Sequence, residues 1–288
     1  MTSATNGHLL HFDQVLRQIR DLPVLPPIVQ DLMKSITRED VDIQLITRKV
    51  SQDQSLSGKT LRFANSSFYG LQSRVTTIQQ AVTLIGVDAV KHVVTTSALT
   101  GYFPAGHVNG LDFTALWRHS IATAVCARVL ARHLHVNQDY AFTAGLLHDI
   151  GRLVLATYFR REYEAVITYR DEHDCHWIEA EQAVLGVTYV TAGVALATHW
   201  NFSESIRNAI AGHYRPENQK VHSLASIVHI ANAVVRALDL SQQPDDRVPP
   251  VSATAWDDLG LSEETYMHVF HETEMMYEEV SRVLLNDA

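Results

Sequence analysis

The sequence predicts an all-α protein made of two packed helical subdomains. Nearly every segment places its apolar residues at the 3.6-residue period of an amphipathic helix, and strand-like alternation bounded by tight turns is hard to find. With 288 residues and 46% hydrophobic content, the chain can bury a sizeable core. A segment rich in glycine, proline and asparagine, GYFPAGHVNGLD at 101–112, marks the boundary between the two subdomains.

The first subdomain is expected over 12–105, after a disordered polar tail at 1–11. Its first helix ends at a break marked by Pro23, Pro26 and Pro27, and a second begins at about Ile28. Two more helices follow, with apolar faces at Ile43, Ile46 and Val50 and at Leu56, Leu61, Phe63 and Ala64. The last pair is a helix that carries Ile78, Val82 and Ile85 and stops at Gly86, and a helix from Asp88.

The second subdomain is expected over 112–240, with a C-terminal loop and helix at 241–288 packed on the same domain. Its helices are predicted at 112–135, 139–158, 160–172, 176–185, 188–199, 203–213 and 220–239. The stretch SQQPDDRVPPVSATAWDDLG at 241–260 is expected to be a loop, because it is rich in turn residues. An acidic amphipathic helix capped by Ser262 closes the chain.

Charge and composition exclude several classes of function. A formal net charge of -9 argues against a general nucleic-acid binder, which needs clustered cations. Two cysteines provide neither a disulfide framework nor a thiolate metal motif. No apolar run approaches the roughly 20 residues of a membrane span, and the first residues do not resemble a signal peptide. We therefore expect a cytoplasmic protein with no membrane contact and no direct nucleic-acid binding.

Three polar side chains fall on the apolar faces of predicted helices. His119 recurs at the helical period with Leu116 and Thr123, so it should point inward. His148 lies on the apolar face of the next helix, with Asp149 one step around it, and Asn232 interrupts the apolar stripe of the helix at 220–239. Buried polar groups cost several kcal/mol unless they are paired. These residues should therefore partner one another or a bound ion.

Both ways of satisfying these groups stay open. Neutral imidazole and carboxylate are common ligands of divalent first-row metals. His199 and His213 are further inward candidates from nearby helices. The alternative is a hydrogen-bonded polar cluster in the core. Other polar groups, among them Glu181 beside His176, and Lys91 with His92, are expected on solvated faces.

The motif LLHDIGR, with His119 about one helix upstream, resembles the HD superfamily of metal-dependent phosphohydrolases. Within it, the chain most resembles the HDOD domains, the HD-related output domains of bacterial signalling proteins. The resemblance covers about residues 12–285, through LPVLPPIVQDLM, VSQDQSLSGKTLRFANSSFYG, TIQQAVTLIGVDAVKHVV, WRHS, GLLHDIGRLVL, EQAVLGVTYVTAGVALATHWNF and AIAGHY. It implies that the second subdomain is an HD-domain-like helical bundle and that the protein is regulatory.

The resemblance carries over only part of the superfamily's metal site. His119, His148 and Asp149 match three of its positions, while Asn232 stands where a catalytic member has aspartate. In two-metal relatives, histidine is expected near positions 189 and 214, where this chain has tyrosine. Arg152 stands where a lysine often follows the His-Asp doublet. The resemblance thus implies a degenerate site, with His119, His148 and Asp149 as candidate metal ligands and with Asn232 and His213 as weaker ones.

These departures favour a non-catalytic signalling module that acts on a protein partner, with no catalytic residue and no cofactor. One carboxylate neutralises a dication poorly, and a phenol with a pKa of about 10 is a poor replacement ligand. Two alternatives stay open. One is a metal-dependent phosphohydrolase acting on a nucleotide or cyclic dinucleotide, with Fe, Mn, Ni or Mg in the residual site. The other is a site that binds a nucleotide without cleaving it.

Overall fold

The structure is a computed structural model that describes residues 12–22, 25, 27, 29–30, 43–66, 69, 71, 73–103, 107–108, 111–217, 223–242 and 247–285. The tail predicted at 1–11 and most of the helix predicted from Ile28 lie outside these residues. The all-α prediction is confirmed. In the described part of the chain, the strands are β1 (His107–Val108) and β2 (Leu111–Asp112), which pair antiparallel within the predicted boundary segment.

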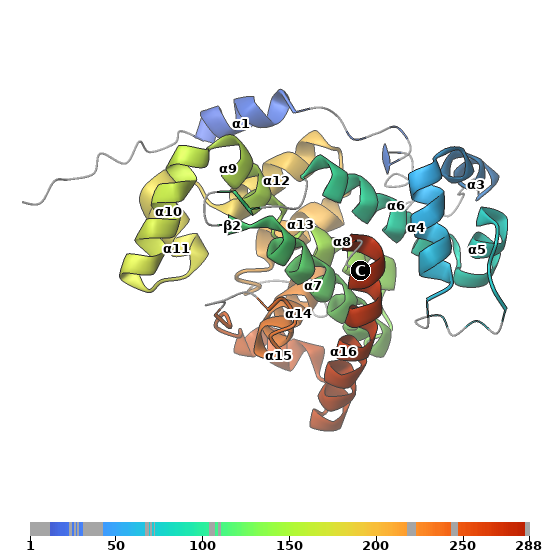
Figure 1. Cartoon of the computed structure of the whole chain (residues 1–288). Coiled ribbons are helices and arrows are strands. Elements are labelled where there is room, and N and C mark those ends of the chain that lie inside the picture. Colours follow the sequence, from blue (N-terminus) through green and yellow to red (C-terminus); the bar gives the residue numbers. More distant parts are fainter. Residues whose placement is uncertain are drawn as a thin grey trace, which may run out of the picture.

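The helices of the first part follow the sequence pattern closely. They are α1 (Phe12–Arg20), α3 (Ile43–Gln52), α4 (Gln54–Ala64), α5 (Ile78–Ile85) and α6 (Val87–Tyr102). Thr77 caps α5 by accepting a hydrogen bond from the Gln80 amide, and Gly86, at φ +87°, ends it. Helices α3 to α6 gather at one end of the molecule, whereas α1 packs against α12 of the second part (Figure 1). The division at 101–112 therefore stays a prediction.

The second part contains the predicted helices, with two corrections. Its helices are α7 (Phe113–His133), α8 (Gln138–Leu147), α9 (Ile150–Tyr158), α10 (Arg160–His173), α11 (Trp177–Leu185), α12 (Tyr189–His199), α13 (Glu204–Gly212), α14 (Leu224–Ala237), α15 (Ala253–Leu259) and α16 (Glu263–Leu285). The prediction of a single helix at 139–158 is wrong, because α8 ends before residue 148 and α9 begins after residue 149. The loop predicted at 241–260 contains the short helix α15, which Ser252 caps. Ser262 caps the last helix as predicted.

The break between α8 and α9 lies at the His-Asp doublet itself. Asp149 has φ -101° and ψ 9°, outside the helical region, and its carbonyl accepts a hydrogen bond from the Arg152 amide at 2.9 Å. The His148 ring donates from Nδ1 to the Gly145 carbonyl at 2.7 Å. The apolar pattern continues unchanged through this tight turn, so periodicity could not reveal it.

One buried cluster runs from Val15 to Leu284 and joins both parts of the chain. Helix α7 lies at its centre, where it packs against α8, α14 and α16 (Figure 1). Glycine allows two close approaches: a Cβ on Gly145 would lie closer than 3.0 Å to the backbone of Ala124, and a Cβ on Gly151 would clash with the backbone of α12. The doublet between these glycines is therefore held against both α7 and α12.

Within the described residues, no single helix has both the length and the apolar content needed to cross a membrane. Two sharply bent helix pairs, α5 with α6 and α11 with α12, reach that length and composition only when joined.

Lys91 and His92 belong to α6 and are buried where this helix packs on α8, so the expectation that they lie on a solvated face is wrong. Their exposed fractions are 3% and 4%, because this face of α6 packs on α8. The His92 ring stacks on Phe142, and its Nε2 lies 3.4 Å from Oδ1 of Asp139. Lys91 Nζ donates to Oδ1 of Asp88 at 2.7 Å. Ionisable groups thus lie across the contact between the two parts of the chain.

The Asp139 carboxyl predicts a pH effect on stability. Burial, and next the neighbouring Asp88 carboxyl, raise its pKa to about 6. Since the pKa of Asp139 is higher in the folded state than in the unfolded state, protonation of this carboxyl stabilises the fold. This stabilisation is complete at low pH and is lost as the pH rises through 6. We expect the free energy of unfolding, relative to Asp139→Asn, to rise by about 1–2 kcal/mol between pH 7 and pH 5. Urea denaturation of both proteins at each pH measures this difference, and parallel pH profiles would contradict the prediction.

Candidate functional site

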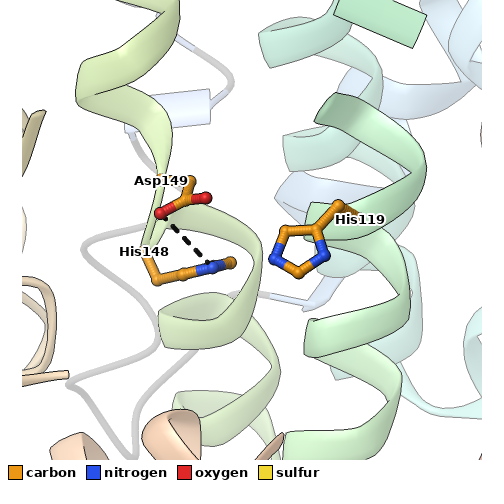
Figure 2. Close-up of side chains that lie close together, drawn as sticks. All are labelled: His119, His148 and Asp149. Carbon is orange, nitrogen blue, oxygen red and sulfur yellow. Dashed lines mark ion pairs between the residues drawn. The ribbon is translucent and has the colours of Figure 1, made fainter. Parts of the chain in front are cut away.

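Three predicted ligands converge in the interior from two elements. His119 comes from the middle of α7, and His148 and Asp149 come from the turn between α8 and α9 (Figure 2). Their exposed fractions are 1%, 0% and 4%, and one ligand atom from each lies within 4.8 Å of the others. The structure therefore brings together the residues that the sequence pattern selected, and these three could hold a metal ion.

The imidazoles in this site are neutral. Burial lowers the pKa of His119 and His148 below the usual value, and lowers that of His213 to about 3. His213, at the end of α13, donates from Nδ1 to the Ile210 carbonyl at 2.9 Å. The Nε2 atoms of His148 and His213 are therefore unprotonated, and they lie 3.5 Å and 3.8 Å from Oδ1 of Asp149. The Tyr189 hydroxyl lies 3.3 Å from Nε2 of His213 and can donate to it.

Arg236 occupies the position between these groups, and the sequence analysis missed it. The Arg236 Nε donates to the Asn232 Oδ1 at 2.9 Å, and Nη2 lies 3.3 Å from Nε2 of His119. The same Nη2 lies 3.8 Å from Oδ2 of Asp149. A guanidinium can only donate, so the His119 Nε2 and the amide oxygen of Asn232 act as acceptors for it. The sequence spacing could have indicated this contact, since Arg236 follows Asn232 by four residues on α14 and side chains at that spacing lie on the same helix face.

Arg152 is the second cation on Asp149. It follows Asp149 by three residues, is 2% exposed, and places Nη2 at 3.4 Å from Oδ2 of the carboxylate. Its Cζ lies 5.0 Å from the ring centroids of both Trp177 and Tyr189, a cation–π geometry. Burial alone would raise the pKa of the Asp149 carboxyl, but the neighbouring charges, Arg152 above all, hold it well below the usual range. Asp149 is thus an anion between two arginines.

Glu181 is completely buried, so the expectation that it lies on a solvated face is wrong. It accepts hydrogen bonds from the Tyr163 hydroxyl at 2.8 Å and from the Tyr189 amide at 2.6 Å. Burial raises the pKa of its carboxyl to about 7. The inward face of α11 packs on α10 and α12, which encloses the side chain. Glu181 therefore anchors the start of α12 and is not paired with His176.

The other predicted histidine is not part of the site. His199 is half-buried at the end of α12, and its Nε2 lies 3.2 Å from the carbonyl oxygen of Leu22, just after α1. It therefore attaches the first helix to the second part of the chain.

The charge of the site opposes a divalent ion, although its donors could reach one. Both Asp149 oxygens and the His148 Nε2 have no hydrogen-bond partner, which is the state expected of metal ligands. The same carboxylate, however, lies within ion-pair distance of two buried guanidinium groups. A dication placed among these donors would be repelled by both arginines at low dielectric. The residues therefore do not fit a tightly held, activated metal ion.

An all-helical bundle with a histidine on one helix facing a His-Asp doublet on the next defines a domain of the HD type. A family model for the HDOD domain matches residues 22–216, and the chain belongs to this family. This confirms the resemblance inferred from the motifs.

Solved structures and a curated relative agree with this assignment. An HDOD domain protein of unknown function from Geobacter sulfurreducens is 24% identical, with a TM-score of 0.79, covering 95% of this chain and 98% of that one. A protein of Shewanella amazonensis SB2B, named provisionally as a phosphohydrolase, is 26% identical, with a TM-score of 0.73 and coverages of 94% and 97%. An uncharacterized protein of Treponema pallidum (strain Nichols) is 27% identical over 246 residues, which are 81% of this chain and 45% of that protein. The chain spans less than half the length of the curated relatives it matches.

Proposed function

We propose that this chain is a non-catalytic signalling module that acts through contacts with a protein partner. The observation that carries the proposal is Arg236, whose guanidinium bridges His119, Asn232 and Asp149. A permanent cation there takes the place that a divalent ion would need, and it cannot activate water by coordinating it. The histidine and aspartate residues then stabilise the bundle and have no part in hydrolysis.

A metal-dependent phosphohydrolase is the second candidate. Both oxygens of Asp149 and Nε2 of His148 accept no hydrogen bond, and this favours the second candidate, because a bound ion would coordinate all three atoms. His119, His148 and Asp149 would hold the ion, and it would supply Lewis-acid chemistry. The name of the Shewanella amazonensis protein also points in this direction. No step of hydrolysis follows from this chain, since Asn232 binds Arg236 and Nε2 of His213 lies beside the Tyr189 hydroxyl.

Elemental analysis separates the two candidates. Protein purified without chelators should contain well under one equivalent of Fe, Mn, Ni or other divalent metal per chain. It should also neither release phosphate from nucleotides nor hydrolyse the phosphodiester bonds of cyclic dinucleotides when these metals are added. A stoichiometric metal that is lost in His148→Ala, together with metal-dependent hydrolysis, would support the phosphohydrolase.

Removing the arginine gives a sharper test. We expect Arg236→Leu to bind Mn²⁺ at least about tenfold more tightly than the wild-type protein, because it removes a buried positive charge next to the donors. Electron paramagnetic resonance of free Mn²⁺ during a titration measures the affinity. Arg161→Leu, an exposed change on α10, is the control and should bind as the wild type does. Tighter binding by the wild type than by Arg236→Leu would contradict a cation-filled site.

A further inference from the structure

A large apolar groove lies between α1 and α12, and its volume is about 600 Å³. Its apolar lining comes from Phe12, Leu16 and Ile19 of α1, from Val190, Val194 and Ala195 of α12, and from α13. The polar part of the lining is His199, two threonines of α12 and Arg20. Phe12 is exposed and Val190 is only half-buried, so α1 leaves this face of α12 incompletely covered. Arg20 is the one side chain with a permanent charge among the described residues that line the groove.

The two walls of the groove have the spacing of helix ridges. On α1, the lining residues Phe12, Leu16 and Arg20 follow one another at four-residue intervals, and three lining residues of α12 share this spacing. Rows of side chains with this spacing form the ridges against which another helix packs. Each row spans about 12 Å, since a helix rises about 1.5 Å per residue. The contact of His199 with the Leu22 carbonyl joins the C-terminal ends of the two helices, so Arg20 lies at that end of the groove.

A ridge of the same spacing is exposed on α16. This ridge, the α16 ridge, consists of Met267, His271 and Met275, which follow one another at four-residue intervals. The two methionines are 61% and 63% exposed, the highest values among the large hydrophobic side chains in the described part of the chain. Methionine is unbranched and adapts its shape to a partner surface. The α16 ridge is also about 12 Å long, so its length matches that of the groove walls.

The two surfaces are complementary in charge. Each exposed methionine has an exposed glutamate one turn beyond it, Glu264 before Met267 and Glu278 after Met275. Residues three apart on a helix are neighbours on one face. A helix laid along the groove in either direction therefore places one of these carboxylates at the end that carries Arg20. Opposite charges at matching positions favour association and fix its register.

A single chain cannot bring the two surfaces together. Helix α16 packs on α7, α4 and α6, whereas α1 packs on α12, and Figure 1 shows α1 and α16 on opposite sides of the molecule. We propose that the α16 ridge of one copy of this chain docks in the groove between α1 and α12 of a second copy. Because the contact joins two different surfaces, every assembly that does not close into a ring keeps a free ridge and a free groove.

This inference goes beyond the proposed function and does not depend on it. Neither surface includes His119, His148 or Asp149, so self-association is compatible with an empty or an occupied site.

Sedimentation velocity of the full chain over a concentration series tests the self-association. We expect the average mass to rise with concentration beyond that of one chain, and added salt to weaken the association. Met275→Lys should weaken it at least about tenfold, because it removes an apolar side chain from the contact and places a charge in an apolar groove. Leu84→Lys, which replaces an exposed apolar residue on α5, is the matched control and should associate as the wild type does.

Mixing two variants tests whether different surfaces meet. Phe12→Asp alters only the groove and Met275→Lys alters only the ridge, so each variant alone should stay monomeric where the wild type associates. An equimolar mixture should form dimers and nothing larger, because it pairs one intact groove with one intact ridge. Circular dichroism checks that the variants fold, and Met267→Lys takes the place of Met275→Lys if the latter does not.

Three results would overturn the proposal. The first is a wild-type chain that stays monomeric at every concentration. The second is association of Phe12→Asp as strong as that of the wild type, which would indicate contact between two α16 ridges. The third is association that begins only after residues 2–11 have been deleted, which would show that this segment occupies the groove. The proposed function stands in each case, because its own tests measure metal content and hydrolysis.

Discussion

Replacing Asp149 with alanine is expected to lower the free energy of unfolding by about 3–5 kcal/mol, the usual cost of leaving a buried charge without its partner. The change leaves Arg152 and Arg236 buried beside each other without the carboxylate that they share. Urea denaturation followed by circular dichroism measures the loss. Asp171→Ala, which removes a 64% exposed carboxylate from a surface ion pair with Arg170, is the control and should change the midpoint little.

A double variant shows whether the arginine is the partner that matters. Asp149→Ala combined with Arg236→Met should lose less stability than the sum of the two single changes, because the buried charge disappears with its partner. A chelator should leave the wild-type midpoint unchanged. An unaltered midpoint in Asp149→Ala would show that this carboxylate is not needed in the cluster. A lower wild-type midpoint in the presence of the chelator would show that a bound metal stabilises the fold.

Gly151→Ala is expected to reduce stability by about 3 kcal/mol or more, because overpacking against rigid backbone cannot relax through a rotamer change. An added Cβ would collide with the Tyr189 carbonyl oxygen and the Gly193 amide nitrogen, both in the backbone of α12. Separation of α9 from α12 would also displace the Asp149 turn and Tyr189. Folded yield and thermal unfolding measure the effect.

Gly58→Ala is the matched control for this prediction. Gly58 lies within α4, and an added Cβ there would meet nothing within 4 Å. Alanine should therefore stabilise the helix by about 0.5–1 kcal/mol through its better helix propensity. If Gly151→Ala were tolerated as well as Gly58→Ala, the close contact of α9 with α12 would be wrong.

The sequence was sufficient for most helices and for the central residues of the site. An apolar face repeats every 3.6 residues whatever surrounds it, so helix positions and the inward direction of His119 and His148 could be predicted from local pattern alone. The break at 148–149 could not, because a tight turn of two residues leaves the apolar pattern intact. The short helix α15 was missed for another reason, because its seven residues lie among loop-forming residues.

The systematic error of the sequence prediction was to place buried ionisable residues in solvent. Lys91, His92 and Glu181 were expected in solvent because charged and polar side chains on amphipathic helices usually face it. In the structure, His92 and Glu181 have partners on other helices, Asp139 on α8 and Tyr163 on α10, whereas Lys91 pairs with Asp88 on its own helix. The partners of His92 and Glu181 are distant in the sequence, and nothing local to either residue reveals them.

The chain's own sequence determined the all-helical fold, the HDOD family and the three inward donors His119, His148 and Asp149, because these depend on local periodicity and on motifs of fixed spacing. Only the tertiary structure decided the electrostatic character of their site. Arg236 reaches His119 across 117 positions of the chain, and Asp149 lies beside both Arg152 on α9 and Arg236 on α14 only after these helices have packed. The Coulomb energy of two charges depends on their distance in space, and for residues far apart in the sequence only the folded structure sets that distance.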